Sequence, residues 1–415
     1  MHPLLLAVFQ RIEHEQIQYC LLRDGDQLKQ LVKNGGEVDL LVRKDQMKLL
    51  EQLLAQFGFG RIPTWGYAPH HFFLAYHEET DCWLKLDIVT EVAYGRPVQA
   101  LRTTLATACL SNRRRLGPTY VPSPEDELIT LLLHCVLDKG YFKPARQQRL
   151  QTLCSAIKDE QYLSALLVLY WSPVTTWPQL ATLIKGEQWE TLLAERESVA
   201  ARLAARDRVG TFARQVRERM LRKLKRWWNW MRPHARSVAL LAPDGAGKST
   251  LSDGIQKTFY YPVRSVYMGL YQKKDEASPG SRLPGSGFLG RILIQWLRYL
   301  SARYHQAHGQ LVIFDRYSYD ALLPSRRELS RAKQWRRWLL AHACPAPNLI
   351  LVLDAPGEIL YSRKREHDPA ALEEQRQGYL QLQERLPQMI IIDATSDPEC
   401  LRRKVMALIW RHYAN

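Results

Sequence analysis

The chain has 415 residues, enough for two or three domains, and 46% of its residues are hydrophobic, as in an ordinary globular protein with a sizeable core. Its formal net charge of +16 indicates anionic partners such as phosphates, nucleic acid or an anionic membrane face. The seven cysteines are scattered without a Cys-x-x-Cys pair, which argues against a disulfide scaffold or a zinc site and favours a reducing, cytoplasmic compartment.

Residues 1–115 alternate helix-like and strand-like patterns, which predicts an α+β domain. The first residues, "MHPLLLAVFQRIEHEQ", lack the basic start and the cleavage site of a signal peptide, so we expect a first helix there. The clearest strands are "GGEVDLLVR" and "CWLKLDIVT". Glu37 and Asp39 lie two residues apart, hence on one face of the first strand, and Asp87 lies on the second. Three carboxylates in this arrangement can hold two Mg²⁺ ions for nucleotidyl transfer.

This carboxylate pattern resembles the nucleotidyltransferase superfamily over roughly residues 1–110. The sequence departs from that family's pattern at Glu37, where the family usually has Asp. It also departs at "LLRDGD", which replaces the expected Gly-Ser turn and in which Asp24 and Asp26 are partial substitutes. We therefore keep three interpretations of this region open: an active transferase, a substrate-binding copy, and a purely structural copy.

Residues 116–200 are expected to form a helical segment attached to this domain. Pro124 behind Ser123, followed by acids, predicts the start of a helix in "SPEDELITLLLHCVL". The stretch 162–184 carries no charge, but two prolines interrupt it. A buried helix that ends near Trp171 and is followed by a turn is therefore favoured over a membrane-spanning helix.

Residues 201–236 are expected to form a basic amphipathic linker helix. This stretch holds twelve Lys or Arg and only two acids. Apolar residues recur at helical spacing among the cations, at Val209, Phe212, Val216, Met220, Leu224, Trp227 and Met231. A basic helix that contains tryptophan can lie flat on an anionic bilayer, so one interpretation is peripheral association with the inner membrane face. The alternative is that Trp227, Trp228 and Trp230 pack against a neighbouring domain and the cations are solvated.

Residues 237–415 show the pattern of an α/β domain. The apolar strands "SVALLAP", "QLVIFDRY", "NLILVLDAP" and "QMIIIDA" are separated by segments long enough for helices. Buried strands that alternate with helices predict a parallel sheet covered by helices on both faces.

The stretch "APDGAGKST" lies between the first of these strands and a helix-like pattern. Small glycines let the backbone curl around a phosphate, and the N–H groups at a helix N-terminus favour negative charge. Lys248 can reach the β- and γ-phosphates, and the Ser249 hydroxyl can sit on Mg²⁺. Ala242 stands where the first glycine of a phosphate loop usually is. We therefore predict that ATP and Mg²⁺ are cofactors, bound by Asp244, Gly245, Ala246, Gly247, Lys248, Ser249 and Thr250.

Further charged residues follow at the ends of the later strands, where ligands bind in open α/β sheets. Asp315, in "VIFDRYSYD", can hold Mg²⁺ through water or accept a proton, and Arg316 can grip an acceptor phosphate in a fork. Asp354 ends the next strand. The basic run "YSRKREHD" carries Arg363 and Arg365, cations that can close over transferring phosphates as a lid.

Together these motifs make residues 237–415 resemble the thymidylate kinase family of nucleoside-monophosphate kinases. The resemblance rests on "DGAGKST", "DRY", "LDAPGEILYSRKRE" and "IIDATSDPECLRRKV", and covers somewhat under half of the chain. It implies that Asp244 lies near the acceptor, that Arg316 holds the acceptor phosphate, and that the backbone of residues 394–396 touches adenine. Arg298 and Arg303 are the candidates for holding the acceptor base.

The expected activity is in-line transfer of the ATP γ-phosphoryl group to a nucleoside monophosphate such as dTMP. A sugar or lipid-linked glycan acceptor is the first alternative, because the segment between the phosphate loop and "DRY" does not align with the family's base-binding residues. A nucleotide-dependent regulatory or nucleic-acid-binding protein is the second, although no nucleic-acid motif accompanies the positive charge. The expected partner is a small phosphate or hydroxyl acceptor and not nucleic acid, and a homodimer is a further expectation.

Overall fold

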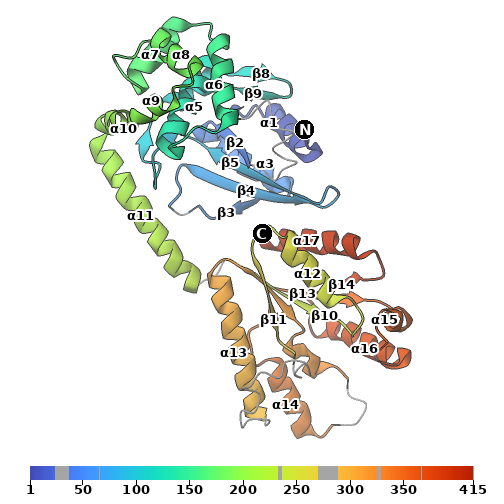
Figure 1. The fold of residues 1–415 in the computed structure, drawn as a ribbon. Coiled ribbons are helices and arrows are strands. Elements are labelled where there is room, and N and C mark those ends of the chain that lie inside the picture. Colours follow the sequence, from blue (N-terminus) through green and yellow to red (C-terminus); the bar gives the residue numbers. More distant parts are fainter. Residues whose placement is uncertain are drawn as a thin grey trace. The chain divides into compact units, whose positions relative to one another are not determined.

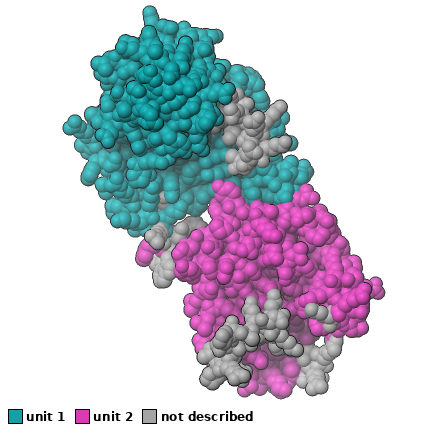
Figure 2. Space-filling model, in the orientation of Figure 1, with its two compact units in different colours: residues 1–225, 414 teal, residues 226–413, 415 magenta. Residues whose placement is uncertain are grey.

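Two compact units divide the chain in the computed structural model, residues 1–225 and residues 226–413 (Figure 2). The first unit contains the expected α+β domain, the helical segment and most of the linker helix, and the second contains the expected α/β domain. The structure describes residues 1–23, 37–64, 66–231, 236–269, 288–324, 329–365 and 367–414.

A five-stranded mixed sheet forms the centre of the first unit (Figure 1). Its strands in spatial order are β1 (Tyr19–Leu21), β2 (Glu37–Val42), β5 (Cys82–Val89), β4 (His70–His77) and β3 (Gly60–Ile62). The two strands expected from the sequence are β2 and β5, which are confirmed and are parallel neighbours. The apolar faces of α1 (Pro3–His14) and α3 (Met47–Gln56) share a core with this sheet.

A helical layer completes the first unit. Its helices are α4 (Leu105–Ser111), α5 (Pro124–Leu133), α6 (Pro144–Ala156), α7 (Glu160–Tyr170), α8 (Trp177–Lys185), α9 (Trp189–Ala194) and α10 (Arg196–Ala205). Two short hairpins join them to the sheet, β6 (Ala93–Tyr94) with β7 (Leu101–Arg102) and β8 (Arg114–Leu116) with β9 (Thr119–Val121). Because buried residues of β1, β2 and β5 belong to the same core as α5 to α8, the helical layer is continuous with the sheet.

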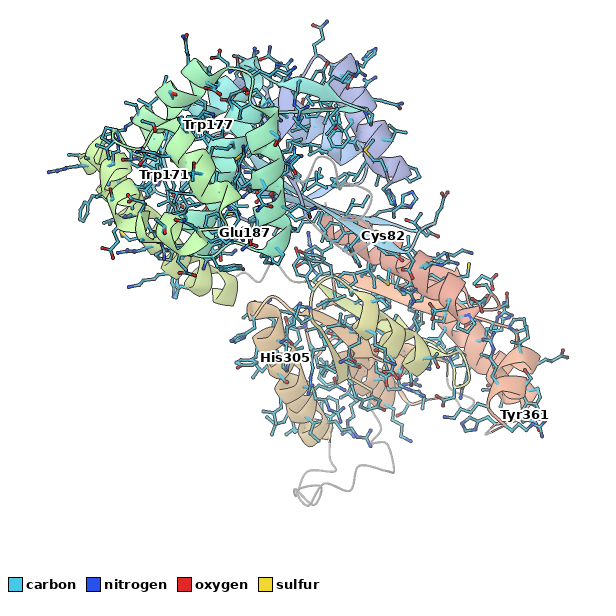
Figure 3. All side chains as sticks on the ribbon, turned by 45° about the horizontal axis from the view of Figure 1, so that its top comes forward. Cys82, Trp171, Trp177, Glu187, His305 and Tyr361 are labelled. Atoms are coloured by element: carbon cyan, nitrogen blue, oxygen red, sulfur yellow. The ribbon has the colours of Figure 1, made fainter. Side chains whose placement is uncertain are left out.

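The local expectations for this layer are confirmed. Ser123 caps α5, where its hydroxyl accepts a hydrogen bond from the Asp126 amide at 3.2 Å. The charge-free stretch forms two helices, α7 and α8, separated by a turn. Trp171 and Trp177 lie at the two ends of that turn, and both are buried among the helices (Figure 3). In the part of the chain that the structure describes, none of the helices has the length and hydropathy needed to span a bilayer.

The predicted linker helix is observed as α11 (Arg208–Met231), a continuous helix that belongs to the first unit as far as Lys225. The side chain of Trp230 and residues Asp24 and Asp26, which the sequence singled out, lie outside the described part of the structure.

The second unit contains a five-stranded sheet in which every strand is parallel to its neighbours, as predicted. Its spatial order is β11 (Val263–Tyr267), β12 (Leu311–Asp315), β10 (Ser237–Leu241), β13 (Leu349–Asp354) and β14 (Met389–Asp393). The surrounding helices are α12 (Lys248–Thr258), α13 (Phe288–Ala307), α14 (Arg331–Ala341), α15 (Gly357–Arg363), α16 (Pro369–Gln381) and α17 (Pro398–Ala414). The central strand, β10, is buried throughout and leads directly into the phosphate loop.

Candidate functional site

The phosphate loop connects β10 to α12 through a tight backbone curl. Gly245 and Gly247 have φ angles of +89° and +84°, the left-handed region that favours glycine. A Cβ atom on Gly245 would lie 2.5 Å from the carbonyl oxygen of Leu360, so the loop passes too close to α15 for a side chain. The curl therefore depends on glycine, and the N–H groups of the first turn of α12 have no helical partners of their own.

Lys248 begins α12, and its side chain is buried under the loop. Its Nζ donates to the carbonyl oxygens of Ala242 at 2.7 Å and of Pro243 at 2.8 Å. Burial, with repulsion from Arg316, lowers the pKa of the Lys248 ammonium to about 8, although Asp244 attracts the charge. The ammonium also lies 3.9 Å from Asp244 Oδ1, so this buried cation has both neutral and anionic neighbours.

Beside the loop, Arg316 connects Asp244 of the phosphate loop with Asp320, which follows β12. Its Nη2 donates to Asp244 Oδ1 at 2.6 Å, and its Nη1 lies 3.7 Å from Asp320 Oδ2. The backbone of Arg316 has a φ angle of +62°, a strained conformation that clusters at functional sites when the surrounding structure enforces it. Burial opposes the charge of Arg316, but Asp244, Tyr379 and Asp320 together outweigh burial and raise the pKa of the guanidinium.

Asp320 and Tyr379 complete this network, and sequence reasoning missed both. The Tyr379 hydroxyl donates to Asp320 Oδ1 at 2.9 Å. Burial raises the pKa of Asp320, against the attraction of Arg316. The available signal was the spacing in "DRYSYD", which places Asp320 four residues after Arg316; Tyr379 lies too far along the chain for any such pattern.

A cavity of about 620 Å³ opens next to the phosphate loop. Arg363 and Lys364 line it from the end of α15, and Arg363 Nη1 donates to the carbonyl oxygen of Ala394 at 2.9 Å. Arg365 is exposed and is not among the lining residues. The other lining residues are Asp244 to Leu251, Gly254, Ala394, Ser396, Pro398, Glu399, Leu401 and Arg402. The segment 394–396, expected beside adenine, is thus part of the same cavity.

Arg402 also lines this cavity, and the sequence analysis did not single it out. Arg402 is buried. Its Nε donates to Glu399 at 2.8 Å, and its Nη1 donates to the Thr258 hydroxyl at 3.0 Å. A Cβ atom on Gly254 would lie 2.9 Å from Arg402 Cδ, so the arginine packs directly against α12.

Ser249 and Asp315 are the two residues predicted to hold Mg²⁺. Ser249 is exposed in the first turn of α12, and Asp315 ends β12, which is paired with β10. The carboxylate of Asp315 lies near the loop, close enough to Lys248 to favour the charged form of that side chain and so to oppose the lowering of its pKa. Hydroxyl and carboxylate oxygens are ligands that Mg²⁺ prefers, and these residues fit the ion.

The other strand-end and helix candidates occupy different positions. Asp354 accepts two hydrogen bonds from Arg376, at 2.6 and 3.0 Å, in an ion pair that ties α16 to the end of β13. Arg298 lies 5.1 Å above the ring of Tyr267, whose register partner on β12 is Asp315. Arg303 lies farther along α13, near enough to Tyr299 for its positive charge to oppose the rise in the pKa of that hydroxyl that burial causes.

The predicted carboxylate cluster of the first unit is assembled in the structure. One oxygen from each of Glu37, Asp39 and Asp87 lies within 4.8 Å of the others, because β2 and β5 pair with Asp39 opposite Asp87. Burial raises the pKa of Glu37, and Asp87 adds to the shift whereas Lys85 opposes it. A donor set of three carboxylates fits a divalent cation.

Each carboxylate of this cluster also contacts a cationic or ionisable side chain. Glu37 lies 2.9 Å from the Lys85 ammonium, and Asp39 lies 2.8 Å from Arg23 Nε. His70 Nδ1 contacts Asp87 at 2.6 Å. Burial opposes the charge of His70, but the hydrogen bond and charge of Asp87, together with the hydrogen bond to Gln99, outweigh burial and raise the pKa of the imidazole.

These carboxylates lie in a cavity of about 510 Å³ within the first unit. A π-helical turn, His134–Lys139, follows α5 and forms one wall; turns of this kind frequently occur at functional sites. Asp138 in that turn accepts hydrogen bonds from the Gly95 amide at 2.8 Å and from His134, and burial raises the pKa of Asp138 to about 6. The cations that line the cavity are Arg23, Arg96, Lys139, Lys143, Arg146 and Arg222.

The parallel sheet, the glycine-dependent loop and the charged strand ends define the second unit as a P-loop kinase-like domain. In agreement, the chain is similar to a probable thymidylate kinase from Thermococcus onnurineus (strain NA1), with 33% identity over 116 residues. The match covers 24% of this chain and 52% of that protein, so the chain spans about half the length of this curated relative. No family model matches the chain.

Proposed function

We propose that the second unit is a phosphotransferase that moves the γ-phosphoryl group of ATP, bound with Mg²⁺, to a nucleoside monophosphate of the dTMP type. One observation carries the proposal. Asp244 lies 2.6 Å from Arg316 on the acceptor side and 3.9 Å from Lys248 in the phosphate loop. The cation proposed for the donor phosphates and the cation proposed for the acceptor phosphate thus flank a single carboxylate, and this closeness supports direct transfer, in which both phosphates must be held near each other.

The roles proposed for the individual residues are those that the sequence motifs and the resemblance to thymidylate kinases imply. Lys248 and the loop amides neutralise the β- and γ-phosphates, and Arg316 orients the acceptor phosphate. Ser249 and Asp315 would hold Mg²⁺, which supplies charge neutralisation between the phosphates. Arg363 supplies positive charge from the lid side. Arg365 would reach the transferring group only after movement of the segment beyond α15.

The acceptor is the part of the proposal that rests on the relative's name and the sequence motifs. Tyr267 and Arg298 form a stacked pair at 5.1 Å on the acceptor side, a surface on which a base or a sugar ring can lie. A sugar or lipid-linked glycan acceptor is therefore the alternative substrate class for the same site.

A substrate panel tests the acceptor class. The full chain is incubated with ATP, Mg²⁺ and, separately, nucleoside monophosphates, sugars, a polyprenyl-linked sugar and RNA, and phosphorylated products are separated. We expect product with a nucleoside monophosphate and none with RNA. Product only with a sugar or glycan moves the proposal to the alternative, and ATP hydrolysis without any acceptor product contradicts a kinase.

We also propose that the cavity of the first unit is a nucleotidyltransferase-like site for a divalent cation and a phosphorylated ligand. The closeness of the three carboxylates supports it, together with the cations that line the cavity. Mn²⁺ titration of the full chain tests the metal by electron paramagnetic resonance. We expect Asp39→Asn with Asp87→Asn to remove one bound ion, and Glu79→Gln, at an exposed acid of the first unit, to keep it. Unchanged Mn²⁺ binding in the double variant contradicts the metal site and leaves an anion-binding or structural copy.

A further inference from the structure

The linker helix α11 exposes its apolar side chains. Six of them form a stripe along the helix, with exposed fractions from 39% to 83%: Val209, Phe212, Val216, Met220, Leu224 and Trp227. Their spacing of three or four residues keeps them on one face. We call this surface the α11 stripe. Trp228 is half-buried and lies beside it.

The opposite, polar face of α11 packs against the first unit. Arg214 Nε donates to the carbonyl oxygen of Ala100 at 3.0 Å, and Arg222 Nε donates to that of Gly66 at 2.7 Å. A Cβ atom on Gly66 would collide with Arg222 and lie 2.8 Å from a backbone oxygen of α11, so the helix touches the Gly66 backbone directly. The polar face of the helix is therefore turned toward the first unit, and its apolar face is exposed.

The charges beside the α11 stripe are of one sign. Arg208, Arg217, Arg219 and Lys223 are exposed along the helix. The one acid of α11, Glu218, is buried and bound to Arg217 at 2.6 Å. A second copy of the chain on this face would bring like charges together, whereas an anionic surface would complement them.

We propose that the α11 stripe docks on a membrane surface of anionic lipid, with the helix parallel to the bilayer plane. The apolar side chains, including Trp227, enter the interface between headgroups and acyl chains, and the flanking cations contact lipid phosphates. Because the polar contacts to Ala100 and Gly66 fix the other face, the first unit is held at the membrane. This docking is independent of the phosphoryl transfer assigned to the second unit.

A second exposed apolar face, on α13, provides an internal comparison. Its exposed apolar residues are Leu289, Leu293, Trp296, Leu297, Leu300 and Tyr304. Among the described cations of α13, Arg291 is exposed whereas Arg298 and Arg303 are half-buried. Because less exposed charge lies beside it, this face is suited to contact with protein. Comparing variants of α13 with variants of α11 therefore shows whether exposed apolar side chains bind vesicles without flanking cations.

Vesicle co-sedimentation of the full chain is the test. We expect binding to vesicles of phosphatidylcholine with phosphatidylserine at low salt, loss of binding at high salt, and no binding to phosphatidylcholine alone. Phe212→Ser with Met220→Ser, and separately Arg219→Glu with Lys223→Glu, should each weaken binding by about tenfold or more. Leu293→Ser on α13 and Val174→Ser, an exposed apolar residue of the first unit, should bind within about twofold of the wild type.

Circular dichroism and thermal melting establish that each variant is folded, and phosphoryl transfer in solution should be unchanged in all four. Three results would overturn the proposal: no sedimentation with anionic vesicles at any salt, equal binding to neutral vesicles, or folded α11 variants that bind as the wild type does. A loss of binding in Leu293→Ser alone would move the docking surface to α13. A concentration-dependent molecular mass that only the α11 variants abolish, without vesicle binding, would assign the stripe to a second copy of the chain.

Discussion

The phosphate loop and the carboxylate cluster are both sites of concentrated charge, and they differ in what neutralises that charge. Lys248 donates to two neutral carbonyl oxygens, and its ion pair with Asp244, at 3.9 Å, is longer than the ion pairs of the carboxylate cluster. In the first unit, Asp39 already contacts Arg23 and Asp87 contacts His70. A charge that is already paired has less to gain from a new partner, because it must first give up the old one. The comparison favours the second unit as the site of phosphoryl transfer.

The largest expected effect is on the lysine of the loop. Lys248→Ala should lower the rate of phosphoryl transfer about 10²- to 10³-fold, since it removes a preorganised donor where charge develops. Steady-state kinetics measures it, with circular dichroism to show that the fold persists. Exposed Lys257→Ala, in the last turn of the same helix, is the matched control and should stay near the wild-type rate. Near-wild-type turnover in a folded Lys248→Ala protein would show that the phosphate loop is not the site of phosphoryl transfer.

The acceptor side should respond differently. Arg316→Ala should lower kcat/KM for the acceptor about 10²-fold and leave the Kd for ATP within a few-fold, because its guanidinium acts on the acceptor phosphate. Kinetics at varied acceptor concentration and ATP binding by calorimetry separate the two. Exposed Arg385→Ala is the control for loss of one positive charge. Equal losses for ATP and acceptor would show that Arg316 belongs to the donor site instead.

Acidity offers a finer test of the loop. The pKa of Lys248 is about 8, and a bound phosphate would raise it, so binding above pH 8 must take up a proton. Affinity for ATP should be flat well below pH 8 and then fall by up to about tenfold per pH unit above it. Calorimetry across this range measures the slope. Lys248→Arg, whose guanidinium stays charged, should bind without this slope; a slope that survives in Lys248→Arg would place the titrating group elsewhere.

The smallest effect is expected in the first unit. Asp39→Asn with Asp87→Asn should leave phosphoryl transfer within a few-fold of the wild type, since the two sites belong to different compact units. The same kinetic assay serves. A loss as large as that of Lys248→Ala, in a folded protein, would mean that the two units build one composite site.

Local patterns predicted the parts of both sites that depend on neighbouring residues. The strand, loop and helix around Lys248 follow one another in the chain, and alternation within one strand was enough to place Glu37 and Asp39 on one face. The pairing of Asp39 with Asp87 joins two strands that are distant in the chain, so the structure was needed to show it. The contact of Asp320 with Tyr379 was not predictable, because it joins residues that are distant in the chain and whose spacing carries no period.

The orientation of α11 was equally hidden. Its helical stripe is plain in the sequence, yet the usual expectation is that such a stripe faces a core. The structure turns the polar face inward because Arg214 and Arg222 bind backbone carbonyl oxygens of Ala100 and Gly66. Carbonyl acceptors belong to every residue type, so no side-chain pattern reveals them.

The most direct test of the account follows the γ-phosphoryl group itself. The full chain is supplied with ATP labelled at the γ-phosphate, Mg²⁺ and dTMP, and the labelled products are separated over time. The account predicts label on the acceptor as a nucleoside diphosphate, formed by the wild type and nearly absent with Lys248→Ala. Label that appears only as inorganic phosphate, with this acceptor and with every other member of the substrate panel, would contradict a phosphotransferase and indicate a nucleotide-dependent switch.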